Sequence, residues 1–413
     1  MEVKAGYKQT KVGVIPEDWA VHQLGAVAFL ERGKFSARPR NQPRFFGGHI
    51  PFIQTGDVTN SNGSISTYTQ TLNSEGLRVT KLFPHETLFF TIAANIGDVG
   101  ITAFETAATD SLIAISPKTS IDKRWLYHSL KKRKKEFVAL ATQNAQLNIN
   151  LEKLRPYPLA VPPLPEQRAI AGALSDVDAL IGTLDQLIAK KRDLKQAAMQ
   201  QLLTGQTRLP GFHGEWEVRR LGDVISHCFS GATPRRNRPD YYKGDIRWIT
   251  SGELNYNVIT DTAEKLTRGA VAQTNLTILP PGTFLMAITG LEAEKTRGSC
   301  GIVGAPSTTN QSCMAIFPTS ELVTQYLFHY YVLRGKALAL QYCQGTKQQS
   351  YTAKLVKKLP IALPPTTTEQ TAIAEVLSDM DAELTALEQR RDKNRDLKQG
   401  MMQELLTGRT RLV

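Results

Sequence analysis

Two stretches decide the fold of this chain: LSDVDALIGTLDQLIAKKRDLKQAAMQQLLTGQTRL at residues 174–209 and LSDMDAELTALEQRRDKNRDLKQGMMQELLTGRTRL at residues 377–412. They align without a gap at an offset of 203, and 22 of the 36 aligned positions are identical. A repeat of this length indicates two copies of one structural unit, so we expect an internal pseudo-two-fold axis.

The repeat extends outward from these stretches in both halves of the chain. Three further pairs of segments match: those that begin at Trp19 and Trp216, HIPFIQTGDV (49–58) with DIRWITSGEL (245–254), and YPLAVPP (157–163) with LPIALPP (359–365). Their offsets are 197, 196 and 202, so insertions and deletions fall between them. Each half therefore keeps a constant frame around a diverged middle, which we expect to carry specificity.

The pattern divides the chain into two variable domains and two long helices. We place these segments at residues 1–162, 163–206, 207–365 and 366–413, where the second and fourth are the helices. Gly, Pro, Asn and Ser punctuate short strand-like runs within the variable domains: 50–54, 87–92, 111–116, 246–250, 283–288 and 312–317. A helix is expected at 122–143, with a counterpart at 321–341. The mixture predicts an α+β fold with two pseudo-symmetric domains.

Both long helices carry apolar residues at alternating steps of three and four, which is typical of a coiled-coil seam. The seam residues are Ile170, Leu174, Val177, Ile181, Leu184, Ile188, Ile373, Leu377, Met380, Leu384 and Leu387. The seam blurs afterwards, where Lys191 and Arg391 fall on or near it. A single helix of this kind would pack on its own domain, but two matching copies favour an antiparallel, coiled-coil-like pair that separates the domains.

Local signals define the ends of these helices. Pro165 suits the first helical turn of one copy, and Thr366 with Glu369 has capping-box spacing in the other. Gly205 and Gly408 in the Leu-Leu-Thr-Gly segments suit C-terminal caps. Each helix then spans about 39 residues, or roughly 58 Å.

The charge of the chain points to a polyanionic partner. The formal net charge is +12. Residues 1–210 contribute +8 and residues 211–413 contribute +4, so both halves are basic. A basic protein without a polyanion partner is the plain alternative. A nucleic-acid surface in each half agrees better with the internal symmetry, because duplex DNA is itself nearly two-fold.

Cysteine usage and hydropathy predict a cytoplasmic protein. Cys228, Cys300, Cys313 and Cys343 form neither a disulfide framework nor a zinc motif, so reduced thiols are expected. We find no apolar run long enough for a signal peptide or a membrane span.

Corresponding loops in the two halves are rich in arginine. ERGKFSARPRNQPRFF and SGATPRRNRPDYYKGD both precede the matched strands at 49–58 and 245–254. Arginine presents a planar fork that suits guanine or phosphate, and a solvated loop is the alternative. The predicted DNA-binding residues of these loops are Arg32, Lys34, Arg38, Arg40, Arg44, Arg235, Arg236, Arg238, Tyr241 and Lys243.

A second pair of loops adds polar candidates. QNAQLNI (143–149) corresponds to QGTKQQS (344–350), and Gln146 corresponds to Gln348. Glutamine can read adenine through N6 and N7, but it also crosslinks loops. Gln146, Lys347 and Gln348 therefore complete the predicted DNA-binding set.

The sequence contains no recognisable active site. We find no phosphate-binding glycine loop, no metal-ligand spacing among the seven His residues and no methyltransferase loop around the Pro-Pro pairs. A Ser, His and Asp set could still converge from distant positions. We expect no catalytic residue, no bound cofactor and no metal in this chain.

The combination resembles the specificity subunit of type I restriction-modification enzymes. The resemblance covers about residues 15–413 and rests on two variable domains, each followed by a Pro-Pro pair, a Glu-Gln pair and a long helix ending in L-L-T-G-x-T-R. The first copy reads P-P-x-x-E-Q, and the second has one more residue before Glu-Gln. SGATP…YYKGDIRWITSGEL is similar to the start of that family's target recognition domains. The first domain departs from this pattern, because its loop lacks the TP and the YY.

The resemblance implies a division of labour among subunits. Each target recognition domain would read one half of a split DNA sequence, and the helices would set the gap and dock two modification subunits. Those subunits would bind S-adenosylmethionine and methylate adenine at N6. Restriction subunits that need ATP and Mg²⁺ would join them. Two other classes stay open: a coiled-coil scaffold that binds proteins only, and an orphan methyltransferase, which the absent motifs oppose.

Overall fold

The computed structural model describes residues 4–141, 148–345 and 349–412. The chain forms two compact units, which are residues 1–185 with 389–413 and residues 186–388. Both units combine helices with β-sheets, which confirms the α+β prediction. No helix within these ranges is both long and apolar enough to cross a membrane.

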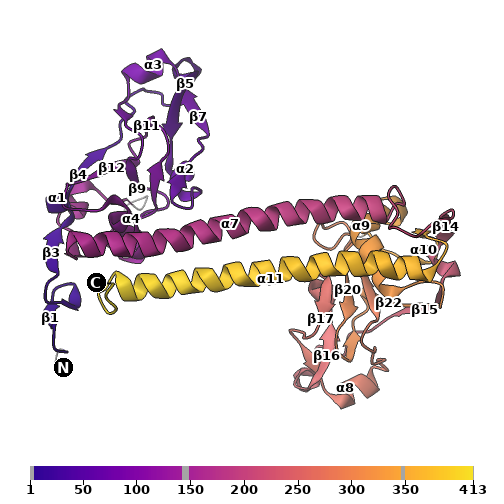
Figure 1. Ribbon diagram of the computed structural model, residues 1–413. Helices are drawn as coiled ribbons and strands as arrows, with labels where there is room; N and C mark the ends of the chain where they lie inside the picture. Colours follow the sequence, from indigo (N-terminus) through magenta and orange to yellow (C-terminus); the bar gives the residue numbers. More distant parts are fainter. Residues whose placement is uncertain (1–3, 142–147, 346–348, 413) are drawn as a thin grey trace. The chain divides into compact units, whose positions relative to one another are not determined.

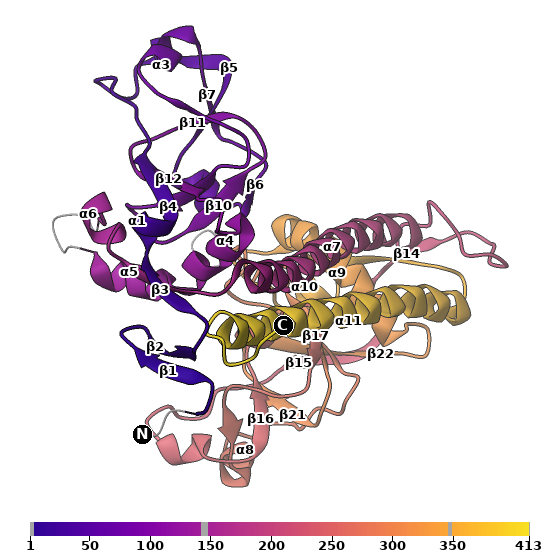
Figure 2. The same ribbon diagram turned by 60° about the vertical axis from the view of Figure 1, so that its left-hand side comes forward.

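The first unit contains two main sheets in two lobes (Figure 2). Its strands are β1 Tyr7–Thr10, β2 Gly13–Pro16, β3 Ala20–Gln23, β4 Ala28–Arg32, β5 Phe46–Ile53, β6 Ser64–Ile65, β7 Gln70–Leu72, β8 Leu82–Phe83, β9 Leu88–Thr91, β10 Val99–Thr102, β11 Thr106–Ala108, β12 Leu112–Pro117 and β13 Pro158–Val161. Its shorter helices are α1 Leu24–Val27, η1 Pro43–Phe45, α2 Thr55–Thr59, α3 Ser74–Arg78, α4 Lys123–Lys132, α5 Lys134–Leu140 and α6 Leu151–Leu154.

The two lobes of the first unit are built on sheets with different strand orders. The lobe that packs on the long helices has the order β4-β12-β9-β10-β6, and the distal lobe has the order β7-β5-β11-β8. All four residues of β9 and the first four of β12 are buried, because these strands are covered on both faces. The distal lobe has its own small core around Phe35, Phe45 and Phe52.

The second unit repeats this plan. Its strands are β14 Glu217–Arg220, β15 Ile225–Ser230, β16 Ile246–Ile249, β17 Asn257–Ile259, β18 Lys265–Leu266, β19 Phe284–Ala287, β20 Cys300–Val303, β21 Ser307–Thr309, β22 Cys313–Pro318 and β23 Pro360–Leu363. Its shorter helices are η2 Leu221–Asp223, η3 Pro239–Tyr242, η4 Ser251–Glu253, α8 Arg268–Gln273, α9 Thr324–Tyr342 and α10 Ala353–Val356. The sheet order β15-β22-β19-β20-β17 matches that of the first unit, and β18-β16-β21 matches β7-β5-β11. Within the described residues, this smaller sheet has no fourth strand equivalent to β8. All six expected strand-like runs are therefore confirmed as parts of β5, β9, β12, β16, β19 and β22.

The prediction of a single helix at 122–143 is wrong. It divides into α4 and α5 at Arg133, whereas its counterpart α9 is continuous over 19 residues. The Arg133 guanidinium donates to the Ser129 carbonyl oxygen at 2.8 Å and caps the end of α4. Consecutive cations crowd this turn, and the end of a helix is where they are best tolerated.

The long helices have the expected length. α7 spans Leu164–Leu202 and α11 spans Thr367–Leu405, with 39 residues each. Gly205 and Gly408 follow them with φ of +70° and +71°, which is the left-handed conformation of a C-terminal glycine. Half of the expected capping box forms, because the Glu369 amide donates to Thr366 Oγ1 while the Glu369 side chain is bound elsewhere.

Each unit contains the start of one long helix beside the end of the other (Figure 1). In the first unit, Ile170 and Leu174 of α7 share a core with Leu405 of α11. In the second, Ile373 and Leu377 share a core with α7 residues near its end. Most seam residues are buried; Val177, Ile181, Met380 and Leu387 are half-buried. The antiparallel pairing is thus confirmed within each unit.

Equivalent ion pairs fix the register of α7 against α11 in both units. Lys398 Nζ lies 2.6 Å from Asp178 Oδ1 in the first unit, and Lys195 pairs with Asp381 in the second. These two pairs are related by the repeat offset of 203. A second related set joins Arg395 to Asp185 and Arg192 to Glu388.

The polar residues that interrupt the seam also bridge the helices. Lys191 Nζ lies 2.7 Å from Glu383 Oε1, and Arg391 lies 3.6 Å from Asp185. Apolar contacts and ion pairs therefore both join the two helices.

Candidate nucleic-acid interface

The arginine-rich loop of the first unit joins β4 to β5 and is anchored on Asp110. The Arg40 guanidinium donates to both Asp110 carboxylate oxygens, at 2.8 and 2.5 Å. Arg32 donates to the Asp110 carbonyl oxygen, and Arg38 donates to two carbonyl oxygens of its own loop. Protein acceptors therefore hold three of the five predicted side chains in place.

The other two predicted side chains of this loop are exposed. The Arg44 guanidinium lies 4.7 Å from the centroid of the Phe45 ring, which is itself buried. Lys34 is exposed, and within the described ranges its ammonium has no protein partner. Both cations are thus placed where a phosphate could reach them.

The arginine-rich loop of the second unit is organised by stacking and ion pairing. The Arg236 guanidinium lies 4.5 Å from the Tyr242 ring centroid and 5.0 Å from that of Trp248. It donates to both Glu264 carboxylate oxygens, at 2.6 and 3.0 Å. Arg238 forms a two-pronged pair with Asp240 at 2.9 and 2.8 Å.

These pairs set the ionisation of the loop. The hydrogen bond to Glu264 raises the pKa of Arg236 above its usual value. The hydrogen bond from Arg238 lowers the pKa of Asp240, so this carboxylate stays ionised well below neutral pH. The loop therefore contains compensated charge rather than a row of free cations, and DNA would have to replace the carboxylates as partner.

Three other predicted residues of this loop differ in exposure. Tyr241 is 6% exposed and hydrogen-bonds Gln273, so its ring belongs to the domain core. Lys243 is exposed. Arg235 is exposed, and its side chain has no partner in the part of the chain that the structure describes. Arg235 is thus the freest cation of the loop.

The second pair of predicted loops cannot be placed. Gln146, Lys347 and Gln348 lie outside the described residues. Their contact with DNA stays a prediction.

A motif shared by the two arginine-rich loops escaped the sequence analysis. RNQPRFFGG at 40–48 aligns with RNRPDYYKG at 236–244, without a gap, at the offset of 196 that relates the strands after them. Phe45 and Phe46 thus stand where the second unit has Tyr241 and Tyr242. The structure supports this alignment, because Pro43–Phe45 and Pro239–Tyr242 form equivalent 3-10 helices. Extending the offset backward from the strands would have revealed it.

The shared arginine takes a different carboxylate in each unit. Arg40 binds Asp110, and Arg236 binds Glu264. The residue that corresponds to Asp110 is Gln311, at the offset of 201 that relates β12 to β22. Gln311 instead accepts a hydrogen bond from Thr233.

The position of Glu264 is also matched by an amide. In the first unit Gln70 is the strand partner of Phe52. In the second, the register continues from Arg247↔Lys265 to place Glu264 opposite Trp248, and the Trp248 amide donates to the Glu264 carbonyl oxygen. Acid and amide have therefore exchanged places between the units.

The repeated helix motifs also meet in space, which the sequence analysis did not foresee. In the first unit, Arg411 of the final T-R segment donates to Glu166 of P-P-x-x-E-Q and to Asp18. Trp19 Nε1 donates to the same Glu166 at 2.8 Å, and Glu166 is fully buried. Arg411 lowers the pKa of Asp18 through this hydrogen bond.

The second unit repeats this contact with fewer partners. Arg208 donates to both oxygens of Glu369, at 2.6 and 2.7 Å. The corresponding Trp216 Nε1 is buried without a partner in the described structure. In both units, the glutamine after this glutamate binds the backbone at the start of the domain helix, Gln167 at Asp122 and Gln370 at Val323.

The described residues of the two units offer few candidates for a catalytic or metal site. Among the described residues no group of three or more His, Cys, Asp or Glu could hold a metal ion. Burial raises the pKa of the Cys313 thiol to about 12, and that of Cys300 also rises, so both stay protonated. Such thiols are poor nucleophiles.

The chain is similar to proteins of one kind along nearly its whole length. The family model described as "Type I restriction modification DNA specificity domain" matches residues 16–190 and 213–395. A putative type I restriction enzyme MjaX specificity subunit of Methanocaldococcus jannaschii is 25% identical, over 98% of this chain and 97% of that protein. The EcoR124I/EcoR124II specificity subunit of Escherichia coli is 25% identical over 41% of each chain.

Solved structures share the fold. The crystal structure of a type I restriction-modification S subunit from M. genitalium has a TM-score of 0.64 at 13% identity, and it covers 98% of both chains. A chain from a structure of complex assembly in a type I R-M system has a TM-score of 0.56 at 14% identity, over 95% of this chain and 99% of that one.

Proposed function

Because this chain belongs to the type I restriction-modification DNA specificity family, we propose that it recognises a bipartite DNA target and directs associated subunits to it. Family membership makes it a DNA-specificity subunit rather than a catalytic one. The finer statement is that each unit reads one half of the target, and that α7 and α11 set the gap between the halves.

The observation that carries this proposal is the placement of the same arginine-rich loop in both units. Each loop precedes the matched strand β5 or β16 and begins its shared motif with Arg40 or Arg236. The strands and helices around these loops are alike, but the residues that surround the two arginines differ. A constant frame with different loop chemistry is what two readers of different half-sites require.

The pairing of α7 with α11 supports the role of the helices. The related pairs Lys398–Asp178 and Lys195–Asp381 fix one register in both units. Lys398 is only 7% exposed, so its charge is neutralised locally rather than offered to a polyanion. A helix pair with a fixed register suits a spacer between two DNA-reading domains.

The proposed partners are double-stranded DNA, two modification subunits and restriction subunits. Methyl transfer to adenine N6 and DNA cleavage would occur in those other chains, which would hold S-adenosylmethionine, ATP and Mg²⁺. This chain would supply the choice of site.

The test is to map adenine methylation in DNA from cells that co-express this chain with its modification subunit. We expect one methylated sequence with two short specified parts separated by an unspecified gap. A single continuous sequence, or methylation without sequence preference, would contradict the proposal. Gel shifts with random duplex across a salt series give an independent check, because phosphate contacts make affinity fall steeply with salt.

The competing function is a coiled-coil scaffold that binds proteins only. The helix pair fits a scaffold, but a scaffold would not need the same arginine-rich loop in both units. Two results together would favour this alternative. The chain would assemble with modification subunits, and the assembly would bind DNA no more tightly, and with no more salt dependence, than the modification subunits alone.

A further inference from the structure

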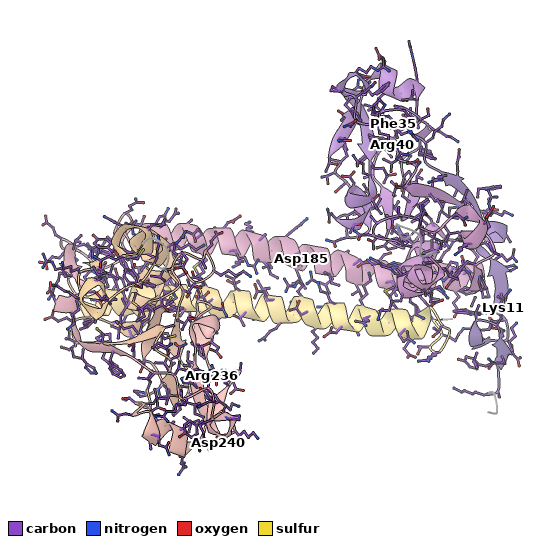
Figure 3. All side chains as sticks on the ribbon, turned by 180° about the vertical axis from the view of Figure 1, so that it is seen from behind. Lys11, Phe35, Arg40, Asp185, Arg236 and Asp240 are labelled. Atoms are coloured by element: carbon purple, nitrogen blue, oxygen red, sulfur yellow. The ribbon has the colours of Figure 1, made fainter. Side chains whose placement is uncertain are left out.

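The distal lobe of the first unit has a recess where, in the second unit, an arginine stacks on two aromatic rings. A cavity of about 510 Å³ lies beside Phe35 and Arg40, which are close together in this lobe (Figure 3). Phe46, Phe52, Gln54 and other polar side chains also line it. Its size suits part of a nucleobase pair rather than water alone.

The exchange of acid and amide opens this recess. Asp110 holds Arg40 at the rim, and within the described ranges no guanidinium lies over the ring of Phe46, which is half-buried. In the second unit Glu264 holds Arg236 over Tyr242 and Trp248. The same arginine thus leaves the aromatic surface open in one domain and covers it in the other.

Two polar groups beside the open rings have no protein partner among the described residues: the Gln70 Nε2 amide and the Thr109 hydroxyl. Gln54 Nε2 donates to Gln70 Oε1 at 2.6 Å, which orients the Gln70 amide. Gln70 is exposed, and its Nε2 donates to no acceptor in the described residues. Thr109 Oγ1 is buried at the recess with no hydrogen-bond partner there. A buried hydroxyl without a partner is costly unless a ligand supplies one.

A phenyl ring next to an oriented amide matches one base pair in the major groove. An A·T pair presents the adenine N7 acceptor and N6 donor on one side and the thymine C5-methyl group on the other. Glutamine reads that adenine edge, and phenylalanine contacts that methyl group. Gln70 and Phe46 offer these two features in one recess, which both line. Phe52 links them, because it is paired with Gln70 across β5 and β7 and its ring centroid lies 6.3 Å from that of Phe46.

We propose that this recess reads an A·T pair in the half-site of the first unit, with Gln70 at the adenine edge and Phe46 against the thymine methyl group. The proposal rests on the proposed function, because it assumes that the first unit reads a half-site. It makes Phe46, Gln70 and Asp110 determinants of specificity, and Asp110 acts by holding Arg40 away from the rings.

The test replaces each thymine of the mapped first half-site by deoxyuridine, one at a time, and measures binding of the assembled methyltransferase complex. Uracil lacks only the methyl group. We expect one position at which this change weakens binding by roughly three- to tenfold. The Phe46→Ala complex should bind thymine and uracil equally at that position. Equal affinity for thymine and uracil at every position with the unaltered protein would overturn the proposal.

Two further variants guard against a folding defect in Phe46→Ala. Gln70→Ala should relax the preference for adenine in the same base pair. The double variant Gln70→Glu with Asp110→Gln copies the acid and amide positions of the second unit, so Arg40 should move over the rings and abolish the uracil effect. A uracil effect that persists in this double variant would contradict the recess as the reader.

The matched control is Tyr242→Ala, which alters the equivalent ring in the second unit. It should leave the uracil effect in the first half-site unchanged. If the unaltered complex shows no sequence-specific binding at all, the proposed function fails. If it binds specifically but shows no uracil effect, only the recess proposal fails.

Discussion

The two recognition units share a frame but differ in how they use one arginine. Arg40 is tied to Asp110 at the edge of an open aromatic recess, whereas Arg236 lies over Tyr242 and Trp248 and is tied to Glu264. Acid and amide have exchanged places at the two partner positions, so each unit still contains one carboxylate for its arginine. The comparison shows how a duplicated domain can change the surface that it presents while the strands and the 3-10 helix around the loop are kept.

The largest effect should come from the buried carboxylate of the first unit. Glu166→Ala removes the partner of both Arg411 and Trp19 Nε1. Removing one partner of a buried ion pair typically costs about 3 kcal/mol or more. We expect a clearly lower melting temperature, measured by calorimetry of the assembled complex.

The equivalent tryptophans sharpen this result. Trp19→Phe breaks a hydrogen bond to a charged group and should cost about 1.5–3 kcal/mol. Trp216→Phe should cost less, because Trp216 Nε1 has no partner among the described residues. Equal destabilisation by the two changes would show that the two anchors do not differ as described.

Acid should weaken both units through a pair of equivalent buried histidines. Burial, followed by the nearby Lys398, lowers the pKa of His128 to about 3, and burial lowers that of His329 to about 4 against an opposing effect of Asp381. The unfolded chain takes up these protons near pH 6.5. Stability is therefore full above pH 6.5 and falls as pH drops toward 4, by roughly 1.4 kcal/mol per pH unit for each histidine.

The histidine comparison can be checked with single variants. His128→Gln and His329→Gln should each flatten the pH dependence of unfolding by a similar amount, because the lowered pKa of each histidine lies below the range measured. The measurement is the free energy of unfolding between pH 4.5 and 7. An unchanged slope in both variants would show that other groups govern acid sensitivity.

Reversing the exchange in the second unit should alter its DNA preference. Glu264→Gln with Gln311→Asp should draw Arg236 away from Tyr242 and Trp248, as Asp110 does for Arg40. We expect about a tenfold loss for the original second half-site, comparable to the loss of one good base contact. Methylation mapping should show the first half-site unchanged. A loss spread over both half-sites would contradict independent reading.

The smallest effect on DNA affinity should come from single arginines of the second unit's loop, and it should differ between an arginine without a partner and a paired one. Arg235→Ala should weaken binding several-fold across all sequences and reduce the salt slope by about 1, as expected for a lost phosphate contact. Arg238→Ala should do less, because Asp240 already neutralises Arg238. Titrations at several salt concentrations distinguish the two. A larger effect of Arg238→Ala would show that its pairing does not persist on DNA.

The sequence predicted the elements that repeat and missed the contacts that differ. Periodicity identified Ile170 and Leu377 as core-facing, and apolar runs identified strands such as β12. It could not predict that Arg40 would bind Asp110, because that acid comes from a turn some 70 residues away. Nor did it predict the break at Arg133, since this depends on a side-chain bond to Ser129 within the helix.

The candidate site was predicted by composition rather than by geometry. Clusters of arginine identified the two loops, but most of those arginines have protein partners. Tyr241 was selected for its place beside them, although its ring packs in the core. The aromatic recess had no signal of its own in a single sequence. It depends on the direction of one side chain, because Arg40 turns toward Asp110 whereas Arg236 lies over the equivalent rings.

The proposed function requires two recognition units held at a set distance by α7 and α11, and a change in the length of one helix tests this requirement most directly. Four residues inserted near Leu203 should lengthen α7 by about 6 Å. Methylation mapping of the complex that contains this variant should show both specified parts of the target unchanged and the gap between them altered by one or two base pairs. An unchanged gap, with full methylation, would contradict the role of the helices as the spacer.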